Sequence, residues 1–193
     1  MKSILFYIGP VPIRAYGLMM VIGFVLGLWR AARVSKRYNI EPERVIDASL
    51  AALIAGIVGS RVLYLLMQVP VDGWSVFSEI HRIWEGGLSF HGGLVAAVLA
   101  VGAYTRLKGI KFLTMADILA PSLAIGYAFA RIGCFLNGCC YGHPTDLPWG
   151  VSFLDPVTHT LTDPSHPAQL YAFIISLGIF GILTRIERLP RPA

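Results

Sequence analysis

Apolar residues in this chain of 193 residues gather in five runs that are separated by shorter polar or basic stretches. The runs cover residues 15–29, 45–69, 88–104, 113–136 and 168–184. A helix needs about 20 mainly apolar residues to cross the hydrocarbon core of a bilayer, and the shorter runs reach that length with their interfacial ends. The pattern predicts an all-α, polytopic membrane protein with about five transmembrane helices in a single integral membrane domain over residues 1–193.

Composition excludes the main alternatives to a membrane protein. Hydrophobic residues make up 55% of the chain and charged residues only 14%, against about a quarter in soluble domains. A soluble surface needs more charge, and a disordered chain has fewer large apolar residues. The 16 Lys and Arg exceed the 11 Asp and Glu, but they lie between apolar runs rather than on one solvated face. We therefore expect the lipid bilayer as a partner and no nucleic acid.

Basic residues predict the orientation, because cytoplasmic loops of membrane proteins carry an excess of Lys and Arg. Only Lys2, Arg14 and Arg82 lie on the side that we assign to the outside. With five crossings, this distribution places the N-terminus outside and the C-terminus in the cytoplasm. The inner set comprises Arg30, Arg33, Lys36, Arg37, Arg44, Arg106, Lys108, Lys111, Arg185, Arg188 and Arg191.

Two arginines, Arg61 and Arg131, fall inside apolar runs. An arginine near the centre of a membrane helix costs about 2.5–3.5 kcal/mol on insertion scales, so it needs a partner, water or a function. Two interpretations stay open for each of them. The guanidinium either extends to the lipid head groups at the interface or binds a lipid phosphate through its planar set of donors.

The densest polar segment runs from Trp84 to Leu94 and contains His91 between the pairs Gly86-Gly87 and Gly92-Gly93. The glycines let a ligand approach the backbone closely. A histidine can accept a proton near neutral pH, although a hydrogen-bonded packing role is the alternative. No second His or carboxylate follows at helical spacing, so a metal site is not expected here.

A second polar segment, Ala130 to Gly142, joins the cation of Arg131 to Asn137, Gly138 and Gly142. A cation, an amide and exposed backbone suit an anionic oxygen ligand. The segment also holds Cys134, Cys139 and Cys140. Their spacing matches no standard zinc motif, so no metal is expected, and a thiol redox role, packing or a structural disulfide stay open.

These segments resemble a known family, the phosphatidylglycerol–prolipoprotein diacylglyceryl transferases of the bacterial inner membrane. The matching pieces follow the family order over nearly the whole chain. They are Ile8-Gly9-Pro10, Tyr16-Gly17-Leu18-Met19, Gly59-Ser60-Arg61, the segment 84–94, Ala120-Pro121, the segment 131–142 and His166-Pro167-Ala168-Gln169-Leu170-Tyr171. The chain departs from the family pattern at Cys134, where Asn is common, and at Cys139, where an acidic residue is frequent.

The resemblance implies a multi-pass enzyme of the bacterial inner membrane that needs no cofactor. It would transfer the diacylglyceryl group from phosphatidylglycerol to the lipobox cysteine of a prolipoprotein, the first step of lipoprotein maturation. By resemblance, His91 is the base and Arg131 holds the phosphate as the second catalytic residue. The substrate-binding residues implied are Tyr16, Arg61, Gly92, Gly93, Asn137, Gly138 and Gly142.

Family members usually have seven spans, and this chain contains five. It is either a fragment or a compact relative, and the sequence leaves both open. Two other functions are alternatives: a catalytically silent homologue that binds anionic phospholipid or lipoprotein precursors, and a membrane thiol oxidoreductase that uses Cys134, Cys139 and Cys140.

Overall fold

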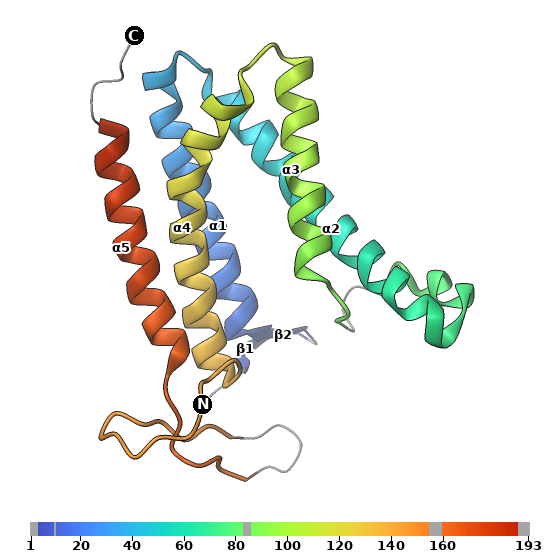
Figure 1. The fold of residues 1–193 in the computed structure, drawn as a ribbon, viewed down its shortest axis with the longest axis vertical. Helices are drawn as coiled ribbons and strands as arrows, with labels where there is room; N and C mark the ends of the chain where they lie inside the picture. Colours follow the sequence, from blue (N-terminus) through green and yellow to red (C-terminus); the bar gives the residue numbers. More distant parts are fainter. Residues whose placement is uncertain (1–3, 10, 83–85, 155–159, 189–193) are drawn as a thin grey trace. The chain divides into compact units, whose positions relative to one another are not determined.

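The computed structural model describes residues 4–9, 11–82, 86–154 and 160–188. Trp84 and Glu85 of the predicted histidine segment lie outside these residues, as do Lys2, Ile83 and Arg191. The described part contains five long helices, two strands and two short 3₁₀ helices (Figure 1). In chain order these are β1 (Ile4–Ile8), β2 (Val11–Arg14), α1 (Ala15–Ser35), η1 (Lys36–Tyr38), α2 (Pro42–Asp72), η2 (Trp74–Glu79), α3 (Phe90–Leu107), α4 (Phe112–Asn137) and α5 (Ala168–Arg188).

All five long helices are long and apolar enough to cross a membrane. The prediction of an all-helical, multi-pass membrane protein with five spans is therefore confirmed, while its orientation stays a prediction. The helices mostly extend beyond the apolar runs, for example from residue 29 to Ser35 in α1. Arg and Lys are good helix formers, so the backbone continues as a helix after the apolar residues end.

A short hairpin precedes α1 and was not predicted. β1 and β2 pair antiparallel with Tyr7 opposite Pro12 and Ile8 opposite Val11. Gly9 lies at the turn with φ of +59°, a conformation that glycine adopts without steric cost. Its strands are only five and four residues long, too short to give a distinct pattern beside the long apolar runs.

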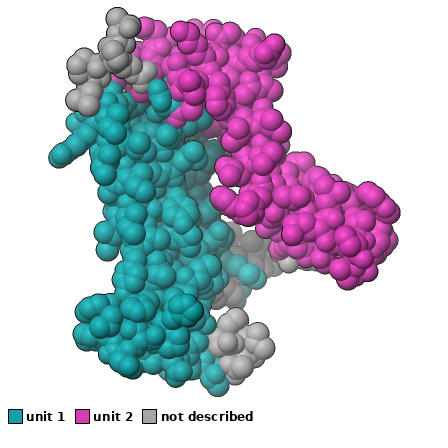
Figure 2. Space-filling model, in the orientation of Figure 1, with its two compact units in different colours: residues 1–31, 117–193 teal, residues 32–116 magenta. Residues whose placement is uncertain are grey.

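The chain falls into two compact units (Figure 2). The first consists of residues 1–31 and 117–193, and the second of residues 32–116. Each is described by itself below. The single membrane domain expected over residues 1–193 stays a prediction.

In the first unit, glycines bring α1 and α4 into close contact. A Cβ atom at Gly23 would lie 2.9 Å from Cβ of Phe129, and one at Gly27 would lie 2.9 Å from the carbonyl oxygen of Ser122. Small residues allow helix backbones to approach in this way within lipid. Gly17 makes no such contact, since an added Cβ would meet nothing within 4 Å.

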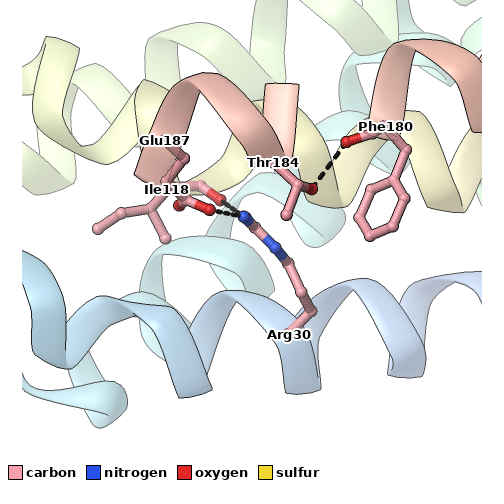
Figure 3. Close-up of polar contacts among 5 residues, drawn as sticks. All are labelled: Arg30, Ile118, Phe180, Thr184 and Glu187. Carbon is pink, nitrogen blue, oxygen red and sulfur yellow. Dashed lines mark hydrogen bonds and ion pairs between the residues drawn. The ribbon is translucent and has the colours of Figure 1, made fainter. Parts of the chain in front are cut away.

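A buried ion pair also connects helices of the first unit. Figure 3 shows the guanidinium of Arg30, in α1, donating to the carboxylate of Glu187 in α5 and to the carbonyl oxygen of Ile118 in α4. The Arg30 and Glu187 side chains are only 10% and 4% exposed. One side chain thus joins three helices through contacts that water barely reaches.

The loop between α4 and α5 has a small apolar core of its own. Phe153 is fully buried, with its ring stacked on Tyr141 at 4.7 Å and edge-on to Phe135 at 5.9 Å. Short antiparallel bridges join Val151 to Ser165 and Leu154 to Leu161. These contacts give the described part of the loop a defined shape next to the end of α4.

In the second unit, α2 and α3 pack backbone against backbone. A Cβ at Gly59 would lie 2.3 Å from Cβ of Ala96, and one at Gly92 would lie 2.3 Å from the carbonyl oxygen of Gly59. Gly93 lies against Gly56, and a Cβ at Gly93 would lie 3.1 Å from the carbonyl oxygen of Gly56. Glycine is therefore required at positions 59 and 92 for this helix pair to form.

Candidate active site

The residues predicted around Arg131 lie where α4 ends. Gly138 has φ of +74°, and its N–H donates to the carbonyl oxygen of Phe135 at 3.1 Å. The N–H of Cys139 donates to the carbonyl oxygen of Cys134, also at 3.1 Å. This pair of bonds after a left-handed glycine is a Schellman motif, which ends the helix and reverses the chain. The motif explains the role of Gly138 and leaves the side chain of Asn137 exposed at the end of the helix.

The guanidinium of Arg131 is partly exposed and is held by one neighbour, Tyr127. Its Nη2 donates to the Tyr127 hydroxyl, and its Cζ lies 4.6 Å from the centre of the tyrosine ring. Among the residues that the structure describes, no carboxylate forms an ion pair with Arg131. Its positive charge therefore remains available to an anion. Tyr127 was missed in the sequence, although its position four residues earlier places it on the same helix face.

Tyr16 lies beside this part of α4. It belongs to the first turn of α1, and a Cβ at Gly133 would lie 3.2 Å from its Cα atom. The absence of a side chain at Gly133 therefore allows the tyrosine to lie against the helix that carries Arg131. The ring of Tyr16 is 41% exposed, so a ligand can still reach it.

Gly142 packs against the chain just before α5. Its N–H donates to the carbonyl oxygen of His166 at 2.9 Å, and a Cβ at this position would lie 3.0 Å from Cβ of His166. The hydroxyl of Tyr171 lies 3.1 Å from Nδ1 of His166 and accepts a hydrogen bond from Nε1 of Trp149 at 2.8 Å. These three side chains fix the segment that faces Gly142. Trp149 was not among the predicted site residues.

The three cysteine sulfurs come together although their spacing gave no such indication. The Sγ atoms of Cys134, Cys139 and Cys140 all lie within 4.8 Å of one another. The Schellman motif turns the chain back over the end of α4, and Gln169 donates to the carbonyl oxygen of Cys139 at 2.7 Å. Cys140 has φ of +62°, a conformation that costs a non-glycine residue roughly 1–2 kcal/mol. Partial burial raises the pKa of the Cys140 thiol, and a hydrogen bond with Cys139 raises it further.

In the second unit, His91 occupies the first turn of α3. Its imidazole is exposed and meets the ring of Phe90 edge-on, with 5.7 Å between the ring centres. Within the described part of the chain it makes no hydrogen bond to protein, so a packing role is not supported by its contacts. Gly92 and Gly93, which follow it, contact α2 as described above.

Arg61 is buried in α2 and only 5% exposed. Its guanidinium donates to three backbone carbonyl oxygens, those of Glu79 at 2.7 Å, Gly86 at 2.9 Å and Gly87 at 3.3 Å. Its Nε atom is buried without a hydrogen-bond partner among the described residues, next to a cavity of about 160 Å³. The side chain therefore holds the segment that leads into α3, while its predicted contact with substrate stays a prediction.

The structure thus groups the predicted residues in two sets. The first unit holds Tyr16, Arg131, Asn137, Gly138 and Gly142 around the end of α4, and the second holds Arg61, His91, Gly92 and Gly93 around the start of α3. The first set provides a cation that pairs with no carboxylate of the described residues, together with the exposed side chains of Tyr16 and Asn137. The second provides an exposed imidazole beside glycine backbone.

Comparison with known proteins decides which family this arrangement belongs to. The sequence model of the family described as "Prolipoprotein diacylglyceryl transferase" matches residues 3–192, which is nearly the whole chain. The chain belongs to the prolipoprotein diacylglyceryl transferase family. The resemblance found in the histidine and arginine segments is therefore confirmed.

Several curated relatives are named phosphatidylglycerol–prolipoprotein diacylglyceryl transferase. The relative from Methylococcus capsulatus is 40% identical over 95% of this chain, and that from Mannheimia succiniciproducens is 38% identical over 98%. The relative from Cupriavidus pinatubonensis is 36% identical over 96%. The chain spans 70%, 70% and 68% of the length of these three family members.

Proposed function

We propose that this chain transfers the diacylglyceryl group of phosphatidylglycerol to the lipobox cysteine thiol of a prolipoprotein. The observation that carries the proposal is the family match over residues 3–192. Prolipoprotein diacylglyceryl transfer is the function of that family, and the names of the relatives give phosphatidylglycerol as the donor. The five apolar helices place the chain in the membrane where such a donor lies.

The reaction needs a base and a cation. A cysteine thiol has a pKa of about 8.5 and must lose its proton to become a good nucleophile. The thiolate attacks the glyceryl carbon that is bonded to the phosphate oxygen, so a C–S bond forms as the C–O bond breaks. Glycerol 1-phosphate leaves and takes the electron pair of the broken bond. The negative charge that develops on the leaving oxygen is stabilised best by a fixed positive group.

We assign the base to His91 and the cation to Arg131. The exposed imidazole of His91 is free to accept the thiol proton, and general base catalysis contributes about 10²–10⁴-fold. The guanidinium of Arg131, held by Tyr127 and unpaired with carboxylate within the described chain, can bind a phosphate with two parallel hydrogen bonds. The nucleophile belongs to the substrate, so no cysteine of this chain attacks.

The remaining predicted residues would shape the binding site for the head group. Tyr16 and Asn137 offer exposed polar side chains, and Gly138 and Gly142 set the course of the backbone after Asn137. In the second unit, Arg61 supports the segment before His91, and Gly92 and Gly93 let α3 pack closely against α2 directly after it. A lipid substrate also requires a location, and we assign the chain to the bacterial inner membrane with its N-terminus outside.

The test uses purified full chain in micelles that contain phosphatidylglycerol and a lipobox peptide. The expected result is a thioether-linked diacylglyceryl peptide, identified by its mass. His91→Ala should lower the rate by at least about 10²-fold. Arg131→Ala should lower it about ten- to a hundredfold, because a charge-assisted contact of roughly 1.5–3 kcal/mol is lost.

Matched controls keep these outcomes specific. His143→Ala removes another exposed histidine and Arg106→Ala another exposed arginine, and both should leave the rate within about twofold of the unmodified chain. Lipid binding without any product would favour a catalytically silent homologue. Replacing all three cysteines by serine should leave transfer largely intact, whereas loss of function in that variant would favour a thiol oxidoreductase.

A further inference from the structure

The cysteine cluster at the end of α4 is not needed for diacylglyceryl transfer, yet it brings three sulfur atoms within 4.8 Å of one another. We propose that Cys134, Cys139 and Cys140 together bind one thiophilic d¹⁰ metal ion of the Zn²⁺ or Cu⁺ class. This inference does not rest on the proposed function, because it concerns side chains that play no part in the transfer.

The geometry of the sulfurs is close to that of a metal–thiolate site. Zinc–sulfur bonds are about 2.3 Å long, so sulfurs that share one tetrahedral ion lie about 3.8 Å apart. The present separations of at most 4.8 Å therefore require each pair to close by no more than about 1 Å. Three thiolates leave the remaining coordination position of a tetrahedral ion open to water.

The backbone that carries the three sulfurs is held in place independently of any ion. Cys134 belongs to α4, and its carbonyl oxygen accepts the backbone N–H of Cys139 at 3.1 Å, a bond that does not depend on the thiol proton. The carbonyl oxygen of Cys139 in turn accepts a hydrogen bond from Gln169 in α5. A chain fixed in this way loses little further conformational entropy when an ion joins the sulfurs.

The charge around the cluster also favours a metal–thiolate complex. Binding converts three thiols into thiolates and releases their three protons to the solvent, so a complex with Zn²⁺ carries one negative charge and a complex with Cu⁺ carries two. Arg131 lies three residues before Cys134 on the same helix face and offsets part of that charge. Thiolate ligands without hard oxygen donors select Zn²⁺ and Cu⁺ over Mg²⁺ or Ca²⁺.

A metal ion uses all three sulfurs, whereas the other arrangements do not. A disulfide joins two cysteines and leaves the third as a free thiol. Simple packing explains Cys134, which is buried, but not Cys140, which is exposed in a left-handed backbone conformation with its sulfur turned toward the other two.

The test titrates the purified, reduced and metal-free full chain with Cd²⁺ alone, as a spectroscopic substitute for the d¹⁰ ions. The expected result is ultraviolet thiolate-to-cadmium absorption that saturates at one ion per chain. Alkylation followed by mass measurement should show all three cysteines protected in the presence of the ion. Competition with Zn²⁺ and with Cu⁺, each added alone, then identifies which ion displaces Cd²⁺ at the lower concentration.

Variants separate this site from adventitious binding. Cys140→Ser removes one proposed ligand at an exposed position and should weaken Cd²⁺ binding at least about tenfold. Mutation of a group that only hydrogen-bonds a metal ligand already lowers metal affinity about 10–100-fold. The triple serine variant should lose the absorption, with its thermal unfolding recorded to confirm that it is folded. Asp146→Asn removes an exposed carboxylate from the same loop and should bind Cd²⁺ unchanged.

Three results would overturn the proposal. The first is a disulfide within the cluster that forms in air as soon as the reductant is removed and is not prevented by the ion. The second is Cd²⁺ binding without thiolate absorption. The third is equal affinity in the unmodified chain and in Cys140→Ser.

Discussion

The guanidinium groups of Arg61 and Arg131, both in apolar helices, have different contacts. Arg61 is buried and donates to three backbone carbonyl oxygens, so its guanidinium is occupied by the protein itself. Arg131 meets a tyrosine hydroxyl and ring, and within the described chain no carboxylate neutralises it. An arginine near the centre of a membrane helix costs about 2.5–3.5 kcal/mol on insertion scales, so its charge needs a partner, water or a function. The contacts of Arg61 fit structural support, whereas those of Arg131 fit the proposed binding of a substrate anion.

The hydroxyl of Tyr127 should matter for the orientation of Arg131. Tyr127→Phe keeps the ring beneath the guanidinium but removes the hydrogen-bond acceptor, and a bond to a charged group contributes about 1.5–3 kcal/mol. We expect transfer to slow about tenfold, with most of the change in KM for phosphatidylglycerol. Steady-state kinetics at varied lipid concentration measure this. Tyr7→Phe, at a tyrosine that is 65% exposed, is the matched control and should have the kinetics of the unmodified chain.

The three hydrogen bonds from Arg61 to backbone carbonyl oxygens should contribute to the free energy of unfolding. Arg61→Lys keeps the charge, but an ammonium group lacks the planar set of donors that reaches Glu79, Gly86 and Gly87 together. We expect the free energy of unfolding to fall by about 1–3 kcal/mol, seen as a lower thermal unfolding midpoint in detergent. Arg106→Lys, at an exposed position, should leave the midpoint unchanged. Equal midpoints for both variants would contradict a supporting role for Arg61.

At the scale of the elements, glycines decide which helices can approach. Apolar runs alone predicted the five helices, because a membrane helix needs only length and hydrophobicity. They predicted neither the hairpin β1–β2 nor the sulfur cluster. The hairpin strands are too short to show a pattern, and the cluster depends on where the chain turns after Gly138.

Contacts between residues distant in sequence could not be predicted from the sequence either. Arg61 was recognised as unusual, but its partners lie 18 to 26 residues away, in η2 and in the segment before α3, where helical spacing gives no information. The role of His91 as a base is implied by the family resemblance and stays a prediction, and the structure adds that this residue is exposed at the start of α3. Tyr127, in contrast, follows the ordinary spacing of four residues and could have been identified.

The contact of α2 with α3 offers a test of glycine packing. Gly59→Ala places a methyl group 2.3 Å from Cβ of Ala96 and 2.7 Å from the carbonyl oxygen of Gly92, so the helices must separate. We expect a loss of about 1–3 kcal/mol in the free energy of unfolding, measured by thermal or denaturant unfolding in detergent. Gly102→Ala, in α3, meets nothing within 4 Å and should be neutral or slightly stabilising. A stable Gly59→Ala variant would mean that the helices do not pack this closely.

At the scale of the molecule, large apolar side chains lie on the surface, whereas a pair of charged side chains is buried. Large apolar residues such as Ile54, Val95, Leu123 and Ile174 are more than half exposed, which suits a surface covered by lipid tails. Inside the first unit, Arg30 and Glu187 form a buried pair that connects α1 and α5. The pair joins residues that are 157 positions apart in the sequence.

Removing one partner of this pair should destabilise the first unit strongly. Glu187→Ala leaves the buried Arg30 without its carboxylate, and breaking a buried pair in this way costs about 3–5 kcal/mol. Thermal unfolding in detergent should show a clearly lower midpoint. Glu43→Ala, at an exposed glutamate, should not change it. The double variant Arg30→Met with Glu187→Leu should recover part of the loss, since it removes both charges together.

The same pair constrains how the protein is made. Arg30 leaves the ribosome 157 residues before Glu187, which at about 5–20 residues per second is an interval of about 8–30 s. During that time the first span is in the membrane with a cation that lacks its final carboxylate. The ion pair that joins α1 to α5 therefore forms only after α5 has been synthesised, so the first unit completes its packing late in translation.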